Sequence, residues 1–178
     1  MSNKEILENA CTSVIELTEH CDPYDISTYA SLYHLMRFIR AEIRDCSHNE
    51  QFYKMYEIIS ANSARLKKLA DIKTVPDVEK ERSTDIPMQI ANTHLSINWL
   101  ICKALREKTV EDYIRLYHIA ALYVQKLFHI AYKSGFLSLF CEIHRDVEWL
   151  ENKMKPDGIH YEKIFKGDGF CANYYNPQ

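Results

Sequence analysis

Three side chains that can bind a metal ion recur at helical spacing in the last third of the chain. Cys141, His144 and Glu148 are three and four residues apart, so in an α-helix they lie on one face. Thiolate, imidazole and carboxylate are all zinc ligands, and a fourth ligand from another segment would complete a tetrahedral site. In the structural alternative, Cys141 lies at the edge of the core and the other two are ordinary surface residues.

Polar side chains also follow one face of an otherwise apolar segment, residues 110–133. Arg115, His118, Gln125 and His129 line up along it, as helical periodicity requires. His118 and His129 are too far apart to share one metal ion, because eleven residues of helix span ~16 Å. The stripe is therefore either a solvated face or a face that meets a groove or a partner.

His94 interrupts a stripe of apolar residues in the segment 90–104. A histidine in that place can fix the register of the helices through a buried hydrogen bond. The alternative is that it lines a pocket for a small ligand. Either interpretation requires a polar neighbour that the sequence does not identify.

Several common catalytic and cofactor sites have no counterpart in the sequence. The first 134 residues contain no glycine, so glycine-rich phosphate loops and dinucleotide fingerprints are absent. No histidine follows a glutamate by three residues, which excludes the paired motifs of di-iron carboxylate bundles. There is also no Gly-x-Ser-x-Gly nucleophile motif. An enzyme whose site assembles from scattered residues is compatible with all of these absences.

Charge and cysteine content narrow the classes of partner and compartment. A net charge of −3 gives no electrostatic footprint for nucleic acid. No stretch approaches the ~20 apolar residues of a membrane span, and the first residues do not resemble a secretory signal. The six cysteines never form a C-x-x-C pair. We therefore expect reduced thiols in a cytoplasmic protein that binds neither nucleic acid nor membrane.

The elements that must position these residues are predicted to be helices. Apolar residues recur three and four positions apart in six segments, which is the pattern of a helix with one buried face. The segments cover 7–21, 29–46, 52–69, 90–104, 114–131 and 136–154. Asp25 or Ser27 is expected to cap the second helix, and a Ser47-x-x-Glu50 capping box the third. Gly135 supplies a left-handed stop after the fifth.

The segment 110–133 is apolar around most of its circumference, which is typical of a helix at the centre of a fold. We therefore predict an all-α protein, a single-domain bundle of about six helices packed around this central helix. The bundle covers residues 1–156 and includes a long connection at 72–86. Residues 157–178 form an irregular C-terminal tail.

These features favour a non-enzymatic helical protein that regulates or interacts by binding another protein, including a second copy of itself. The missing catalytic motifs and the many aromatic residues, which are enriched at interfaces, support this prediction. The tyrosines expected at the surface are Tyr24, Tyr53, Tyr56, Tyr113, Tyr174 and Tyr175. The alternatives are a bundle that binds a small ligand or a metal, and an enzyme with a scattered site. Zinc is the only cofactor that the sequence suggests.

Overall fold

The computed structural model describes residues 2–19, 25–46, 48–70, 86–107 and 110–154. Every regular element in these ranges is an α-helix, so the predicted all-α single domain is confirmed. The helices are α1 (Asn3–Glu19), α2 (Ile26–Arg44), α3 (Glu50–Leu69), α5 (Ile86–Glu107), α6 (Val110–Ser134) and α7 (Leu137–Met154). The expected tail at 157–178 lies outside the described residues, as does the connection at 72–86 apart from Ile86, which begins α5.

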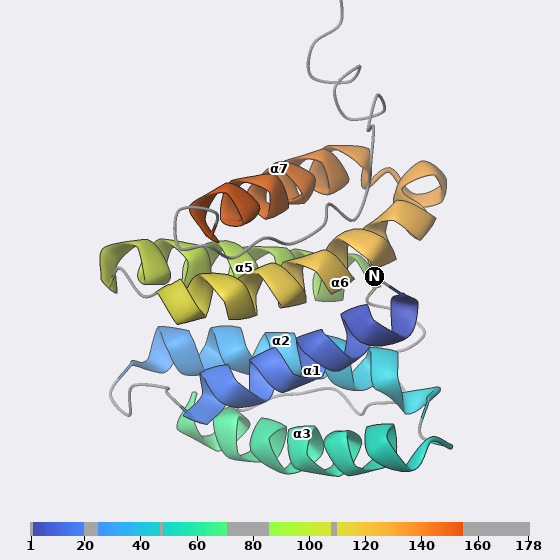
Figure 1. Ribbon diagram of the computed structural model, residues 1–178, viewed down its shortest axis with the longest axis vertical. Helices are drawn as coiled ribbons and strands as arrows, with labels where there is room; N and C mark the ends of the chain where they lie inside the picture. The colour runs from blue at the N-terminus through green and yellow to red at the C-terminus, as the bar shows by residue number, and fades with distance from the viewer. Residues whose placement is uncertain (1, 20–24, 47, 71–85, 108–109, 155–178) are drawn as a thin grey trace, which may run out of the picture.

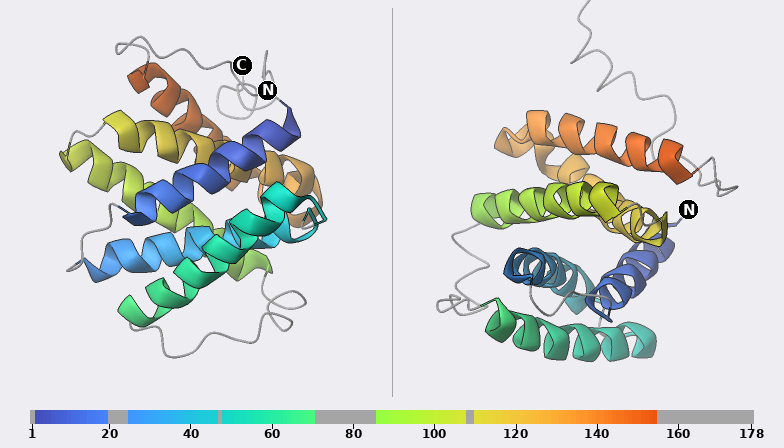
Figure 2. Two further views of the ribbon diagram at one scale, coloured as in Figure 1. Left: turned by 60° about the horizontal axis from the view of Figure 1, so that its bottom comes forward. Right: turned by 90° about the vertical axis from the view of Figure 1, so that its left-hand side faces the viewer.

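The helices are stacked in four layers (Figure 1). α3 forms one outer layer, α1 and α2 the next, α5 and α6 the third, and α7 the other outer layer, an order that is also clear in the second pair of views (Figure 2). α1 packs on α6, and α2 packs on both α3 and α5. The core therefore fills the spaces between successive layers.

Two helices share the central position. α6 is buried over most of its length, from Tyr113 to Leu127, as its apolar circumference predicts. It packs against α1, α5 and α7, whereas α2 occupies the equivalent place against α1, α3 and α5. The sequence pointed to α6 alone. Phe128, near the end of this helix, is 41% exposed.

Local sequence signals explain where the helices begin and end. Asp25 caps α2, because its side chain accepts a hydrogen bond from the backbone N–H of Thr28 at 3.0 Å. The cap of α3 is Asn49, which accepts from the N–H of Gln51, so the predicted Ser47-x-x-Glu50 capping box is wrong. Gly135 has a φ of 72°, the left-handed conformation that glycine adopts at low cost.

None of the helices in the described ranges combines the length and the apolar character needed to cross a membrane.

Candidate functional site

One face of α5 carries exposed apolar side chains that no other helix in the described ranges covers. Ala91, Leu95, Trp99 and Cys102 are all exposed, and at 100° per residue they project within roughly 80° of one another. Leu95 is 66% exposed and Trp99 is 36% exposed. Leu105, also exposed, lies at the edge of this group. We call these five residues the α5 face.

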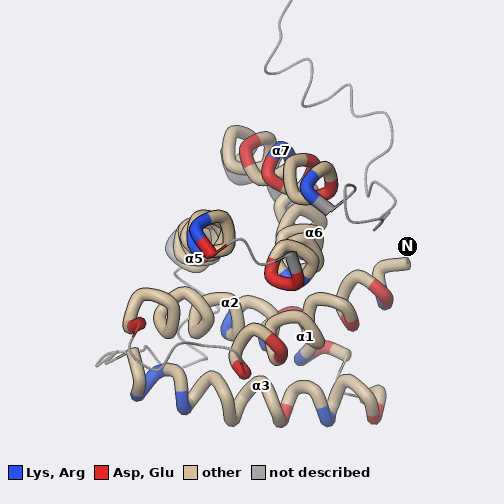
Figure 3. The backbone as a smooth tube through the Cα atoms, turned by 60° about the vertical axis from the view of Figure 1, so that its left-hand side comes forward, with Lys and Arg blue, Asp and Glu red and all other residues tan. Residues whose placement is uncertain are grey.

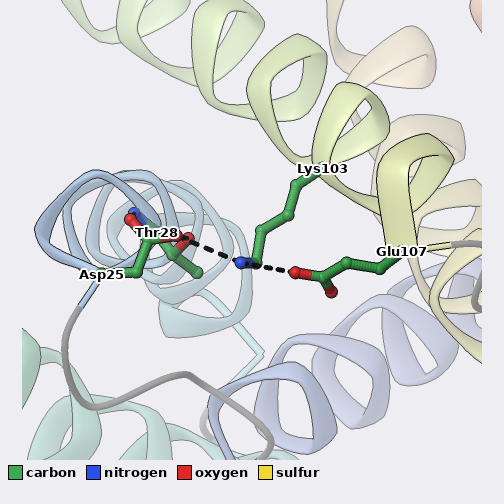
Figure 4. A network of polar contacts seen from close by, with 4 residues as sticks. All are labelled: Asp25, Thr28, Lys103 and Glu107. Atoms are coloured by element: carbon green, nitrogen blue, oxygen red, sulfur yellow. Dashed lines mark hydrogen bonds and ion pairs between the residues drawn. The ribbon is translucent and has the colours of Figure 1, made fainter.

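A polar contact on one flank of the α5 face joins α5 to the beginning of α2 (Figure 4). Lys103 Nζ lies 3.1 Å from Asp25 Oδ2 and 2.8 Å from Glu107 Oε1. Asp25 Oδ2 also accepts a short hydrogen bond of 2.5 Å from the hydroxyl of Thr28. The ammonium group therefore lies between two carboxylates, and each of these groups has a partner.

The same contacts determine the charge states on this flank. The hydrogen bonds from Thr28, followed by the contact with Lys103, lower the pKa of Asp25 to about 2. The hydrogen bond to Glu107 and the contact with Asp25 raise the pKa of Lys103. Asp25 and Lys103 are therefore both charged at neutral pH. We name the arrangement of Asp25, Lys103 and Glu107 the Lys103 contact.

The opposite flank of the α5 face meets α7 through His94 and Glu142. His94 is 5% exposed, and its Nε2 lies 3.0 Å from Glu142 Oε1. Although this distance suits an ion pair, neither ring nitrogen has the geometry of a hydrogen bond with any group in the described ranges. Asn98, one turn along α5, donates to the same Oε1 at 3.4 Å, which is a long hydrogen bond.

A second carboxylate lies one turn further along α7. Asp146 Oδ2 is buried and has no hydrogen-bond donor among the described groups. Burial, followed by the negative charge of Glu142, raises the pKa of Asp146, whereas the contacts with His94 and Asn98 lower that of Glu142. We name His94, Asn98, Glu142 and Asp146 the His94 cluster.

Tyr123 of α6 is the aromatic neighbour of the His94 cluster. Its ring packs against that of His94, with 5.9 Å between the ring centroids, and its hydroxyl donates to the carbonyl oxygen of Ile90 at 3.2 Å. Burial raises the pKa of Tyr123 above its usual value, so the phenol is neutral at physiological pH. The imidazole of His94 is thus held between an apolar aromatic ring and the carboxylate of Glu142.

The α5 face is therefore an apolar strip with charged groups on both sides. Figure 3 shows α5 end-on between α7 and α2, with acidic and basic positions at its near end and mixed charges along α7. Arg106 adds a cation over the ring of Trp99, 5.4 Å from its centroid. Chemically, this arrangement suits the binding of a surface that is apolar in the centre and charged at the rim.

The predicted polar stripe on α6 meets a partner within the same chain. Arg115 Nε lies 2.9 Å from Glu16 Oε2 of α1, and Gln125 donates a hydrogen bond to the side chain of Asn3. Because later residues of α6 pair with earlier residues of α1, the two helices run antiparallel. α1 therefore covers much of the face that was expected to meet solvent, a groove or a partner.

The two histidines of that stripe differ in their surroundings. His118 is half-buried, and burial lowers its pKa despite the nearby charge of Glu16. His129 is exposed. His94 does not belong to this group, since it lies at the contact of α5 with α7. The structure thus gives the two histidines of the stripe different surroundings.

The zinc hypothesis receives no support from the geometry. Cys141 and His144 are buried and Glu148 is half-buried on α7. In the ranges described above, no group of three or more His, Cys, Asp and Glu side chains is placed to hold a metal ion. The alternative that treated His144 as a surface residue was wrong, because its ring is buried and packs against Phe140.

The expected surface tyrosines are only partly confirmed. Tyr53 is exposed and Tyr56 is half-buried. Tyr113 is buried, and its ring packs edge-on against that of Trp149, so its predicted exposure was wrong. The other three, Tyr24, Tyr174 and Tyr175, lie outside the described residues.

Sequence reasoning missed both Glu142 with Asp146 and the α5 face. A signal for the face was present, because Leu95, Trp99 and Leu105 lie off the stripe that α5 buries. A second helix with apolar residues on more than one face was therefore visible in the sequence. Glu142 and Asp146 are four residues apart, so their common helix face was also visible, but nothing indicated that it would meet His94.

No family model matches this chain, and no curated protein or solved structure shows significant similarity to it.

Proposed function

We propose that this protein acts by binding another protein, and that the α5 face is the contact surface. The observation that supports this most is the exposure of Leu95 beside Trp99 on one side of a helix whose other side is in the core. Scattered apolar residues are normal at a surface, whereas an apolar group bordered by polar residues is typical of an interaction site. Tryptophan is also among the residues that contribute most to binding energy.

The size of the face indicates what kind of complex it forms. From Ala91 to Leu105 it is ~21 Å long, at 1.5 Å per residue. A strip one helix wide buries far less than the ~800 Å² per partner of a standard stable interface. The partner must therefore also contact a flank of the strip, or the complex is transient.

A photo-crosslinking residue at position 95 tests this function in cells that make the protein. We expect a discrete crosslinked product that is lost when Trp99→Asp is added. Ile58→Asp is the matched control, because Ile58 is 47% exposed on α3, in the outer layer farthest from α7. Crosslinks that are equally abundant in the Trp99→Asp and Ile58→Asp variants, or no crosslinked product at all, would contradict the proposal.

The small-ligand and enzymatic alternatives have one observation in their favour. A histidine beside a carboxylate is an arrangement that general acid–base catalysis uses, and His94 lies 3.0 Å from Glu142. Only Glu142 of this pair has a substantially exposed side chain, at 47% compared with 6% for His94. We rank these functions lower because a substrate would have little access to the imidazole. Elemental analysis of protein purified without chelators tests whether the protein binds zinc.

A further inference from the structure

We propose that the partner presents an amphipathic helix, which packs apolar side chains on the α5 face and places an arginine or lysine against Glu142. This inference deepens the protein-binding function proposed above and rests on it. It specifies the secondary structure and the charge of the partner, which the exposure of Leu95 and Trp99 alone does not indicate. Three observations lead to it, concerning the shape of the strip, the charges on its flanks and the unpaired atoms of the His94 cluster.

The first observation is the spacing of the strip. The exposed residues of the α5 face recur at Ala91, Leu95, Trp99, Cys102 and Leu105, with steps of four, four, three and three. This is the spacing at which one helix packs along another. A second helix lying on α5 therefore meets side chains at each turn, whereas an extended peptide finds no exposed strand edge in the described ranges to pair with.

The second observation is that the two flanks differ in their unsatisfied charge. On the α2 side, Lys103 lies between Asp25 and Glu107, so the charges are already paired. On the α7 side, Glu142 has a half-exposed side chain and lies one turn from Asp146. The cationic groups nearest to this pair are His94, when it is protonated, and Arg145 of α7 itself. An acidic side chain from a partner would meet two carboxylates there, and a basic one would be attracted.

The third observation is that three buried atoms of the His94 cluster lack a hydrogen bond in the described ranges. Both ring nitrogens of His94 and Oδ2 of Asp146 are in this state among the described groups. A buried polar atom without a partner is costly, and native proteins keep few of them. A guanidinium group carries five N–H donors in one plane, so an arginine against the half-exposed Glu142 brings donors to this flank. The flank that accepts a cation is therefore the flank where donors are missing.

Asn98 connects the strip to this acidic flank. It lies on the α5 face side of the helix, and its amide contacts Glu142 Oε1. A helix on Leu95 and Trp99 would consequently place a side chain from its adjacent turn within reach of Glu142. Arg106, which covers Trp99 in the free protein, must share or leave the indole ring when the helix docks. Docking should therefore alter the fluorescence of Trp99.

Fluorescence titration with two synthetic peptides tests the inference. Trp149→Phe leaves Trp99 as the only tryptophan, since the chain has two. One peptide is an amphipathic helix of leucine and arginine, and its twin has glutamate at every arginine position, each about 18 residues long so that a helix can form. We expect the basic peptide to bind at least ~10-fold more tightly than the acidic twin, a difference of about 1.4 kcal/mol.

Charge variants locate the contact. Glu142→Lys should weaken binding of the basic peptide ~10-fold and improve binding of the acidic one, because the attraction is reversed. Glu142→Gln keeps the shape of the side chain and should have a smaller effect in the same direction. Glu19→Lys is the matched control, since it changes the net charge by the same amount at an exposed position on α1. If Glu19→Lys has the same effect as Glu142→Lys, peptide binding depends only on the net charge of the protein, and the inference is wrong.

The outcomes separate this inference from the function on which it rests. If both peptides bind equally and Leu95→Asp abolishes both, the α5 face binds helices but the acidic flank does not select them. If neither peptide binds and the crosslink at position 95 is also absent, the function itself is wrong. If sedimentation shows a dimer that Leu95→Asp disrupts, the occupant is a second copy and the basic helix is excluded.

Discussion

The two polar contacts that flank the exposed face of α5 differ in how completely their atoms are paired. In the Lys103 contact, an ammonium group, two carboxylates and the cap of α2 satisfy one another. In the His94 cluster, the closest pair lies at 3.0 Å, while the ring nitrogens of His94 and an oxygen of Asp146 lack hydrogen bonds within the described structure. The first is organised as a structural joint, and the second retains the unpaired polar atoms that are typical of binding sites.

This comparison predicts that substitutions on the two flanks change stability in opposite directions. Loss of a member of the paired group should destabilise the fold. Removal of an unpaired polar group should cost little or should stabilise the fold, because its burial is not compensated. Measurements of unfolding on both flanks of the same helix therefore decide whether the distinction is real.

The largest effect is expected for Asp25→Ala. This change removes the N-cap of α2 and one partner of Lys103, so the free energy of unfolding should fall by about 1–2 kcal/mol. Urea denaturation followed by circular dichroism measures it. Ser27→Ala is the matched control, because Ser27 is exposed and Asp25 is the residue that caps the helix. A loss below about 0.5 kcal/mol for Asp25→Ala would show that the Lys103 contact is not a structural joint.

A smaller effect of opposite sign is expected for His94→Leu. Leucine fills a similar volume beside Tyr123 and removes two buried nitrogens, so the free energy of unfolding should stay unchanged or rise by up to about 1 kcal/mol. The same urea titration gives this value. His94→Gln retains a polar group and should be the less stable of the two variants. A loss above about 2 kcal/mol for His94→Leu would place His94 among the structural contacts.

The two flanks should also differ in how their stability depends on pH. The pKa of Asp25 is lowered to about 2, so its stabilising contribution is complete above the unfolded pKa of about 3.9 and is lost as the pH falls toward 2. The pKa of Asp146 is raised. Protonation of Asp146 therefore favours the folded state, and its contribution becomes more favourable as the pH falls toward about 4.

Asparagine variants isolate the contributions of Asp25 and Asp146 to the pH dependence of stability. Asp25→Asn should flatten the loss of stability below about pH 4. Asp146→Asn should remove the gain at low pH and raise the free energy of unfolding at pH 7. Unfolding midpoints in urea at a series of pH values between 7 and about 2.5 measure both. Parallel curves for the two variants would contradict the proposed difference between the flanks.

The helices could be predicted from sequence because each carries its own apolar stripe. The buried circumference of α6, the cap at Asp25 and the left-handed Gly135 all follow from residues close together in the chain. The partner of Arg115 could not be predicted in this way, since Glu16 lies 99 positions earlier. Periodicity indicates that a helix has a polar face, but it does not indicate which other helix covers that face.

The same limit explains the choice of candidate residues on α7. The core stripe of this helix includes Phe140, Ile143 and Val147, and acidic or metal-binding residues flank it on both sides. The sequence analysis selected the side with His144 and Glu148, whereas the side with Glu142 faces His94. Which flank meets α5 depends on how α5, α6 and α7 cross, and this geometry is not encoded in the spacing along one helix.

The pairing of α1 with α6 has a consequence for the order of events during synthesis. With 99 positions between Glu16 and Arg115 and a translation rate of roughly 5–20 residues per second, α1 is made roughly 5–20 s before the residues that cover it. Through that interval α1, whose apolar face is buried in the folded protein, lacks the helix on which it packs most extensively. The nascent chain thus exposes an apolar segment that chaperones can bind. α1 can reach its final position only after α6 has left the ribosome.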